Sequence, residues 1–232
     1  MNSLPDGYRA LVIGSSGGIG AALREQLAGD PRCAEVLELG RHTRPHIDYH
    51  DEHSIAAAAA ALRERGPLHL LLLATGVLSA PGRPPEKRLG QIGYAQMLDN
   101  FIVNTVGPAC VLRHFCPLLA PRERSLVAAL SAKVGSIGDN RLGGWYSYRA
   151  SKAALNMVLR TAAIELGRSH PQAVVAALHP GTVDTRLSAP FRAPGARRAP
   201  SLAAAELLQV LDRLGPEHSG GFWSYSGERL PW

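Results

Sequence analysis

Cysteine is scarce in this sequence of 232 residues, and long apolar runs are missing. The three cysteines form neither a CxxC pair nor a Cys/His ligand spacing: Cys33, Cys110 and Cys116. This pattern argues against a disulfide framework and against a metal site, so we expect free thiols and no bound metal. The longest apolar stretches are well short of the roughly 20 residues that a membrane-spanning helix needs, so no span is expected.

The start of the chain, Met1 to Asp6, also lacks the basic segment, apolar run and small-residue cleavage site of a secretory signal. We therefore expect a cytoplasmic protein. The net charge of +6 is carried by scattered arginines, with Arg197-Arg198 the close pair near an expected loop. No nucleic-acid recognition module accompanies this charge, so a nucleic-acid partner is not expected. An arginine-rich surface instead favours an anionic ligand such as a phosphorylated dinucleotide.

Apolar runs that are typical of buried parallel strands alternate with stretches long enough for helices. The expected strands are Tyr8–Ile13, Ala34–Leu39, a short one at His46–Asp48, Leu68–Ala74, Ser125–Ser131, Ala173–His179 and Gly221–Tyr225. The expected helices are Gly18–Ala28, Asp51–Arg65, Ile92–Leu119, Tyr146–Gly167 and Ser201–Leu214. This order predicts one α/β domain over residues 1–232, a Rossmann-like doubly wound parallel sheet of about seven strands with helices on both faces.

A glycine-rich turn lies directly after the first expected strand and before the first expected helix. It reads Gly14-Ser15-Ser16-Gly17-Gly18-Ile19-Gly20. Glycine lets the backbone approach a pyrophosphate, and the helix amino terminus presents free N–H groups and a positive dipole. The serines can add hydroxyl donors. With 24 glycines the spacing alone is weak evidence, but its position predicts a phosphate-binding turn rather than a purely structural one.

The end of the second expected strand bears on which dinucleotide is held. An acidic residue there would hydrogen-bond an unmodified ribose, but Gly40 and Arg41 stand in its place. Arginine can pair bidentately with a phosphate, which favours the 2′-phosphate of NADP(H). A solvated surface arginine is the alternative.

Tyr148 and Lys152 are four residues apart in a stretch of helical composition, so they share one helix face. A phenol with a pKa of about 10 is a poor acid–base catalyst at neutral pH, but an adjacent ammonium group lowers that pKa. Tyr148 could then exchange a proton with a substrate oxygen. A chance Tyr-x-x-x-Lys is expected roughly 0.08 times in such a chain, so this motif is more specific than the glycine turn. Tyr146 lacks such a partner.

The glycine turn, Asn104 and the Tyr148-x-x-x-Lys152 motif, in this order, resemble the short-chain dehydrogenase/reductase family over essentially the whole chain. Three further stretches are similar to the C-factor-like branch of that family: Gly135–Asn140, Gly143–Tyr146 and Gly227–Trp232. The resemblance implies an oxidoreductase that transfers a hydride between NADP(H) and a small carbonyl or alcohol substrate, with Tyr148 as acid or base. Lys152 would hold the nicotinamide ribose.

The resemblance also implies further cofactor contacts. Asp48 and Tyr49 would lie by the adenine, and Ala74-Thr75-Gly76 beside the cofactor. Asn104 would shape a helix and support a water-linked proton path to the lysine. A Pro-Gly turn would hold the nicotinamide carboxamide through Pro180, Gly181, Val183 and Thr185 and begin a mobile substrate loop over residues 186–200. His179 is expected to be structural.

The chain departs from the family pattern at the catalytic serine. The usual Ser-Ser pair is replaced by Ser131-Ala132, which leaves Ser131 and Ser136 as equal candidates to orient the substrate oxygen. The departure also keeps open a second function, an NADP(H)-binding regulatory or signalling protein of the same fold with little turnover. The long helices Ile92–Leu119 and Tyr146–Gly167 could pair between subunits, so a homodimer is expected.

Overall fold

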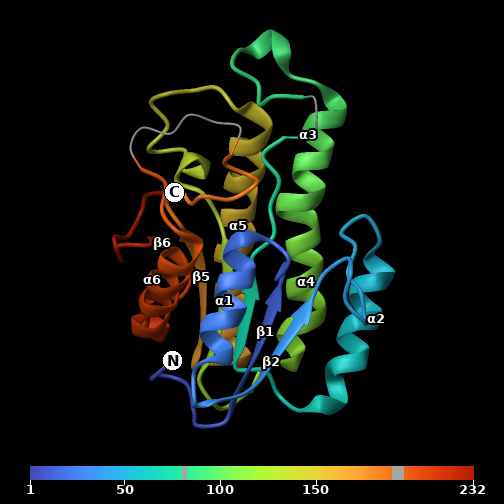
Figure 1. Ribbon diagram of the computed structural model, residues 1–232, viewed down its shortest axis with the longest axis vertical. Coiled ribbons are helices and arrows are strands. Elements are labelled where there is room, and N and C mark those ends of the chain that lie inside the picture. The colour runs from blue at the N-terminus through green and yellow to red at the C-terminus, as the bar shows by residue number, and fades with distance from the viewer. Residues whose placement is uncertain (80–82, 190–195) are drawn as a thin grey trace.

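Six parallel strands form the single sheet of the computed structural model, which describes residues 1–79, 83–189 and 196–232 (Figure 1). The strands are β1 (Tyr8–Ile13), β2 (Cys33–Leu39), β3 (Leu70–Leu73), β4 (Ser125–Leu130), β5 (Ala173–His179) and β6 (Gly221–Ser224). Their order is β2-β1-β3-β4-β5-β6, and every neighbouring pair is parallel. The Rossmann-like architecture expected from the sequence is therefore confirmed.

The expected seventh strand at His46–Asp48 is absent, so the prediction of about seven strands was one too many. The segment after β2 folds back on the end of that strand. The Thr43 hydroxyl donates to the Pro45 carbonyl oxygen at 2.6 Å and the Ile47 N–H donates to the Gly40 carbonyl oxygen at 3.0 Å. Asp48 forms only an isolated bridge with Asp51. These local hydrogen bonds occupy backbone groups that pairing with a neighbouring strand would need.

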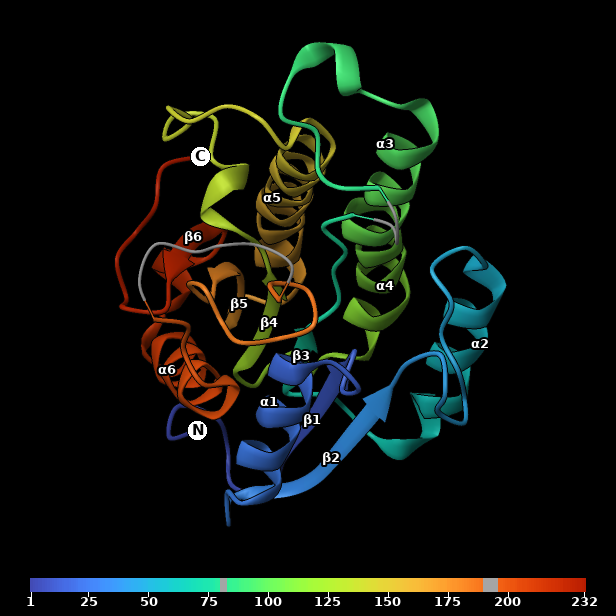
Figure 2. The same cartoon turned by 45° about the horizontal axis from the view of Figure 1, so that its top comes forward.

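Helices cover both faces of the sheet (Figures 1 and 2). The helices are α1 (Gly18–Ala28), α2 (Glu52–Leu62), α3 (Tyr94–Phe101), α4 (Gly107–Phe115), α5 (Tyr146–Ser169) and α6 (Pro200–Arg213). The single helix expected over Ile92–Leu119 is instead α3 and α4 joined by a π-helical turn, Ile102–Val106. Such turns are rare and often mark functional sites.

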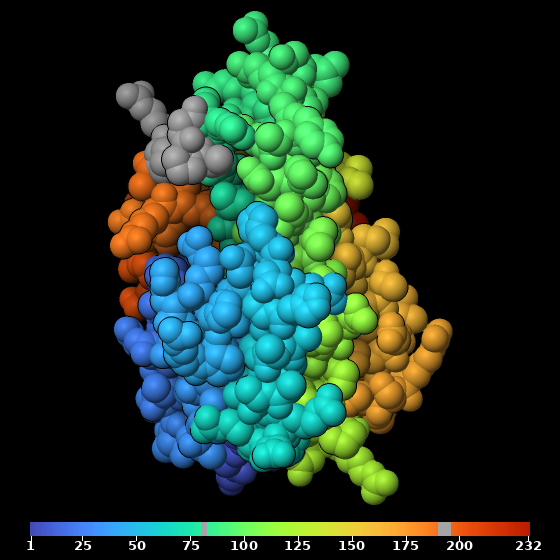
Figure 3. Space-filling view, turned by 90° about the vertical axis from the view of Figure 1, so that its right-hand side faces the viewer, coloured from blue at the N-terminus to red at the C-terminus, as the bar shows by residue number. Residues whose placement is uncertain are grey.

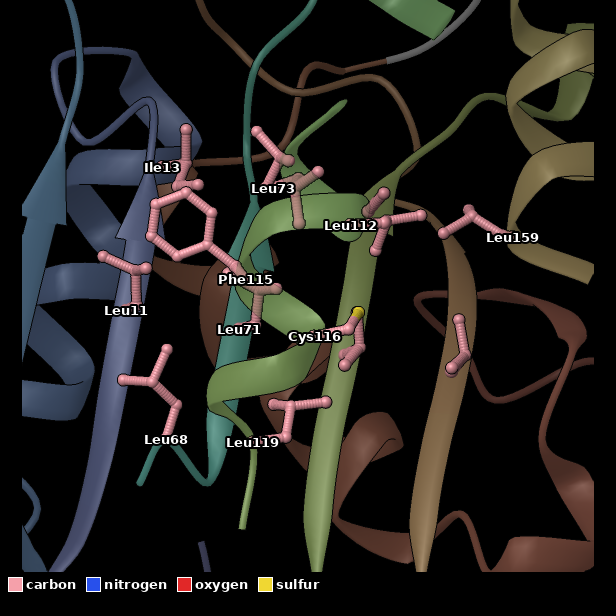
Figure 4. Packing of buried hydrophobic residues seen from close by; sticks show 14 of the residues in the cluster. Leu11, Ile13, Leu68, Leu71, Leu73, Leu112, Phe115, Cys116, Leu119 and Leu159 are labelled. Carbon is pink, nitrogen blue, oxygen red and sulfur yellow. The ribbon is translucent and has the colours of Figure 1, made fainter. Parts of the chain in front are cut away.

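Alternation along the strands divides the core into two layers. In β1, Leu11 and Ile13 face α2, α4 and α5, whereas Ala10 and Val12 face α1 and α6. Figure 4 shows the first layer, where Phe115 packs over the β1 and β3 side chains. Because both faces are covered, the polar groups that could meet a ligand gather at the carboxyl ends of the strands.

One stretch, Tyr94–Leu118, is long and apolar enough by length and composition to cross a membrane. It comprises α3, the π-helical turn and α4, and 44% of its most apolar window is buried. It contacts both α2 and α5, and together these three helices form one side of the molecule in Figure 3. These contacts are those of a helix packed within the protein.

Candidate active site

The glycine turn, the β3 end and the β5 end meet at the carboxyl edge of the sheet, as expected from the parallel topology. Figure 2 brings this edge toward the viewer. Two close approaches define the meeting point. A Cβ placed on Gly14 would lie 2.7 Å from Cγ2 of Thr75, and one on Gly18 would lie 2.9 Å from Cγ2 of Thr185. Three motifs far apart in sequence are therefore in contact.

The glycine turn packs as tightly as a phosphate-binding turn requires. A Cβ on Gly20 would lie 2.2 Å from the Gly14 carbonyl oxygen, a contact that only glycine avoids. Gly17 is the N-cap of α1 and offers no side-chain cap, and the first turn has no acidic residue. The N–H groups of this first turn therefore have no side-chain cap, as at helix ends that bind anions. Ser16 is exposed, whereas Ser15 is buried and donates to Glu38 at 2.8 Å.

Tyr49 lies deeper than the sequence suggested. Its hydroxyl is 2.9 Å from the Thr75 hydroxyl, and a Cβ on Gly107 would lie 2.2 Å from the Tyr49 ring. Burial raises the pKa of Tyr49 to about 12, so the phenol stays neutral. The Tyr49 hydroxyl thereby holds the Thr75 side chain at the end of β3.

The segment after β2 carries exposed cations. Arg41 and Arg44 are exposed, and the charge of Arg41 contributes to lowering the pKa of Asp48. The largest cause of that lowering is the hydrogen bond from the His50 N–H to the Asp48 carboxylate, at 2.9 Å. Asp48 therefore faces its own turn, while the arginines remain free to meet an anion.

Asn104 sits in the π-helical turn and ties three elements together. Its Oδ1 accepts from the Val77 N–H at 2.9 Å, and its Nδ2 donates to the Val77 carbonyl at 2.8 Å and to the Ser151 hydroxyl at 3.0 Å. The side chain is 1% exposed. This residue thereby fixes the segment after β3 against α5.

Tyr148 and Lys152 lie on the first two turns of α5 and are both buried. The Lys152 Nζ donates to the Leu130 carbonyl at 2.7 Å and lies 6.0 Å from the centroid of the Tyr148 ring. A Cβ on Gly76 would lie 3.4 Å from this Nζ and 3.5 Å from Asn104 Oδ1. The end of β3, the asparagine and the lysine thus surround one point.

Burial pushes both side chains toward their neutral forms. It raises the pKa of Tyr148 and lowers the pKa of Lys152 to about 7. The sequence predicted that the lysine lowers the Tyr148 pKa, but the pKa is raised, because desolvation penalises both charges. A neutral phenol is the form that can donate a proton.

The two candidate serines are engaged elsewhere. The Ser131 hydroxyl donates to Asn156 Oδ1 at 2.6 Å, and the Ser136 hydroxyl accepts from the Asp139 N–H at 3.1 Å. Both serines are nearly fully buried. Ala132, between β4 and the turn Lys133–Gly135, has no hydroxyl to offer.

The turn after β5 packs against Tyr225 and pairs with the segment at Arg198. Gly181 has a φ of 73°, and a Cβ there would lie 2.7 Å from the Tyr225 ring. Val183 is buried and pairs with Arg198, which closes the base of the expected loop. Pro180 is half-buried. Of that loop, residues 190–195 lie outside the described residues.

His179 ends β5, and its Nδ1 accepts from the Lys133 N–H at 3.2 Å. It thereby joins the end of β5 to the turn after β4, in line with the structural role expected for it. Among the described residues, no group of three or more His, Cys, Asp or Glu side chains could hold a metal ion.

Three further side chains at the site were not singled out by the sequence: Asn100, Arg149 and Glu86. Asn100 Oδ1 accepts from Asn104 Nδ2 at 3.3 Å, and the four-residue spacing of these asparagines was the available signal. Arg149 donates to the carbonyls of Val134, Gly143 and Gly144, which fixes the loop before α5. Glu86 hydrogen-bonds Ser147, 61 residues away, so no local pattern pointed to it.

Comparison with known proteins agrees with this geometry. A family model described as enoyl-(acyl carrier protein) reductase matches residues 20–215. The chain is 33% identical over 232 residues to 1-hydroxy-2-glutathionyl-2-methyl-3-butene dehydrogenase from Rhodococcus sp. (strain AD45), covering 96% of this chain and 98% of the relative. It is 38% identical over 148 residues to C-signal from Myxococcus xanthus, covering 62% and 83% of the two chains.

Solved structures are similar over nearly the whole chain. NADPH-bound carbonyl reductase from chicken fatty liver superposes with a TM-score of 0.85 at 25% identity, covering 99% of this chain and 100% of that one. The carbonyl reductase Sniffer of D. melanogaster, at 23% identity and a TM-score of 0.83, covers 97% and 99% and supports the fold. The likeness to C-signal confirms the narrower resemblance to the C-factor-like branch. By its motifs, its fold and its relatives, the chain belongs to the short-chain dehydrogenase/reductase family of oxidoreductases.

Proposed function

We propose that this protein is an NADP(H)-dependent oxidoreductase acting on a carbonyl or alcohol group, with Tyr148 as its acid or base. The observation that carries the proposal is the burial of Tyr148 and Lys152 on one face of α5, where the Lys152 Nζ and Asn104 Oδ1 both lie next to Gly76. A merely exposed helical pair would have no such surroundings.

The residues at the sheet edge fit a dinucleotide. The first turn of α1 has no side-chain cap and no acidic residue, so its N–H groups would be available to a phosphate, and the close packing at Gly14 and Gly20 fixes the shape of this turn. The exposed Arg41 favours NADP(H) over NAD(H), because its guanidinium would pair with the 2′-phosphate. Arg44 is a second exposed cation on the same segment. That the similar chicken enzyme is NADPH-bound agrees with this choice.

A dinucleotide held at this edge would supply the hydride from its nicotinamide ring. Tyr148, kept neutral by burial, donates its phenolic proton to the substrate oxygen during reduction and takes it back during oxidation. The negative charge of the phenolate that forms would favour the protonated form of Lys152, which stabilises that phenolate, and Lys152 would also hold the nicotinamide ribose. Ser131 and Ser136 stay equal candidates to orient the oxygen, although each hydroxyl must first give up the hydrogen bond it makes here.

A regulatory NADP(H)-binding protein with little turnover is the rival function, motivated by Ala132. NADPH consumption against ketones, aldehydes and quinones separates the two, and a glutathionyl alcohol with NADP⁺ adds the substrate type named for the Rhodococcus relative. We expect turnover with at least one of these substrate classes. NADPH binding with no turnover with any of them would reject the enzyme.

We also propose a cytoplasmic homodimer. All three cysteines are free, as a reducing compartment would keep them. Exposed apolar side chains on the outer faces of the π-helical turn and α5 suit an isologous helix interface: Val106, Met157 and Ile164.

A further inference from the structure

Glu86 is a deeply buried acid that the proposed chemistry does not use. It lies in the segment between β3 and α3, and only 2% of it is exposed. A carboxylate almost never lies this deep without a partner, because the loss of its hydration is costly. The ion pairs formed within the described ranges do not include Glu86. Some other group must therefore satisfy its oxygens.

Those partners all belong to the start of α5. The Ser147 hydroxyl donates to Glu86 Oε1, and the Ser147 N–H donates to Oε2 at 3.3 Å. The Glu86 carbonyl oxygen accepts a further hydrogen bond from the Trp145 N–H. A Cβ on Gly144 would lie 3.5 Å from the same carbonyl oxygen. Both the main chain and the side chain of Glu86 thus accept hydrogen bonds from the N-terminal end of α5.

The start of α5 has no local cap of its own. The first turn of a helix leaves four N–H groups without intrahelical partners, and a negative charge there is favourable. The N-cap residue, Trp145, makes no side-chain cap, and the first turn contains no acidic residue. Trp145 also has a φ of 54°, a left-handed conformation that is rare for a bulky residue. Glu86 supplies from a distant segment what the sequence of α5 omits.

Tyr148 belongs to this same first turn. It directly follows Ser147, and its ring and the Trp145 ring form a T-shaped pair with the centroids 6.3 Å apart. We propose that Glu86 is a positioning residue, which caps α5 from a distant segment of the same chain and so fixes the phenol of Tyr148 for proton transfer. The catalytic part of this inference rests on the proposed function. The cap itself does not.

Three variants test the inference on the intact protein: Glu86→Ala, Glu86→Gln and, as a control, Glu64→Ala. Glu64 is an exposed acid in the short helical turn after α2. We expect Glu86→Ala to lower kcat about 10- to 100-fold while the Kd for NADPH changes less than about twofold, because a misplaced catalytic group slows chemistry more than binding. Glu86→Gln keeps one oxygen that accepts from Ser147 but loses the charge and the second acceptor, so its kcat should lie between those of Glu86→Ala and wild type. Glu64→Ala should leave both values unchanged.

Hydrogen–deuterium exchange supplies the readout that does not need turnover. Peptides covering residues 145–150 should exchange faster in Glu86→Ala, while those from β1 and α6 keep the wild-type rate. Unchanged exchange at residues 145–150, or a rise spread over the whole protein, would overturn the inference. So would a Glu86→Gln protein as slow as Glu86→Ala. If the wild type turns over no substrate, the proposed function fails, yet the exchange rates still decide whether Glu86 caps α5.

Discussion

Burial lowers the pKa of His179 to about 4, well below the ordinary value for histidine, and the nearby Lys133 charge adds to the effect. The unfolded chain takes up a proton at this residue near pH 6.5, while the native protein resists it until about pH 4. Between these values the unfolded state binds more protons, so the stability contributed by neutral His179 is lost progressively as the pH falls.

We expect His179→Asn to lose less stability than the wild type between about pH 6.5 and 4, because asparagine cannot be protonated there and its amide oxygen can still accept from Lys133. Thermal denaturation at a series of pH values checks this. His53→Asn is the control, since His53 is fully exposed. Parallel curves for wild type and His179→Asn would contradict the assignment.

The helical element that bears Asn104 shows why some features could be predicted from the sequence and others not. The Tyr-x-x-x-Lys spacing of α5 is local, so it predicted a shared face correctly. The π-helical turn depends on hydrogen bonds from Asn104 to Val77 and Ser151, which lie 27 and 47 residues away. No window around residue 104 contains that information, and a straight helix was predicted instead.

The turn between β1 and α1 gives the sharpest prediction for an element. Gly20→Ala would place a Cβ 2.2 Å from the Gly14 carbonyl oxygen, and the backbone cannot give way there. We expect a loss of about 1–3 kcal/mol in the free energy of unfolding, and weaker NADPH binding. Gly17→Ala is the matched control, since its Cβ would meet the same oxygen at 3.4 Å. Urea denaturation and cofactor titration measure both. Equal effects at the two positions would refute the packing argument.

For the whole molecule, the alternation of strand and helix was enough to predict a doubly wound sheet, because parallel strands need crossover helices. The error lay at the edge of the sheet. A short strand was expected at His46–Asp48, where only Ile47 is apolar. The Thr43 hydroxyl donates to the Pro45 carbonyl and the Asp48 N–H donates to the Ser54 hydroxyl, so the segment forms turns instead. Side-chain hydrogen bonds of this kind compete with the backbone hydrogen bonds between strands. The pattern of apolar residues in the sequence does not reveal them.

The proposed dimer is tested at the same scale. Light scattering after size-exclusion chromatography should give about twice the mass of the 24.7 kDa chain. Met157→Lys and Ile164→Lys place charges on the exposed face of α5 and should shift the mass toward the monomer. The exposed Leu142→Lys is a control away from that face, in the loop before α5. A monomeric wild type would remove the dimer.

The central claim is that Tyr148 transfers the proton, and comparing Tyr148→Phe with Tyr146→Phe tests it most directly. Both tyrosines lie in the first turn of α5, but only Tyr148 has Lys152 one turn further on. With the carbonyl substrate that the panel identifies, we expect Tyr148→Phe to lower kcat about 10²- to 10⁴-fold while NADPH still binds, and Tyr146→Phe to remain near wild type. Full turnover by Tyr148→Phe would contradict the account.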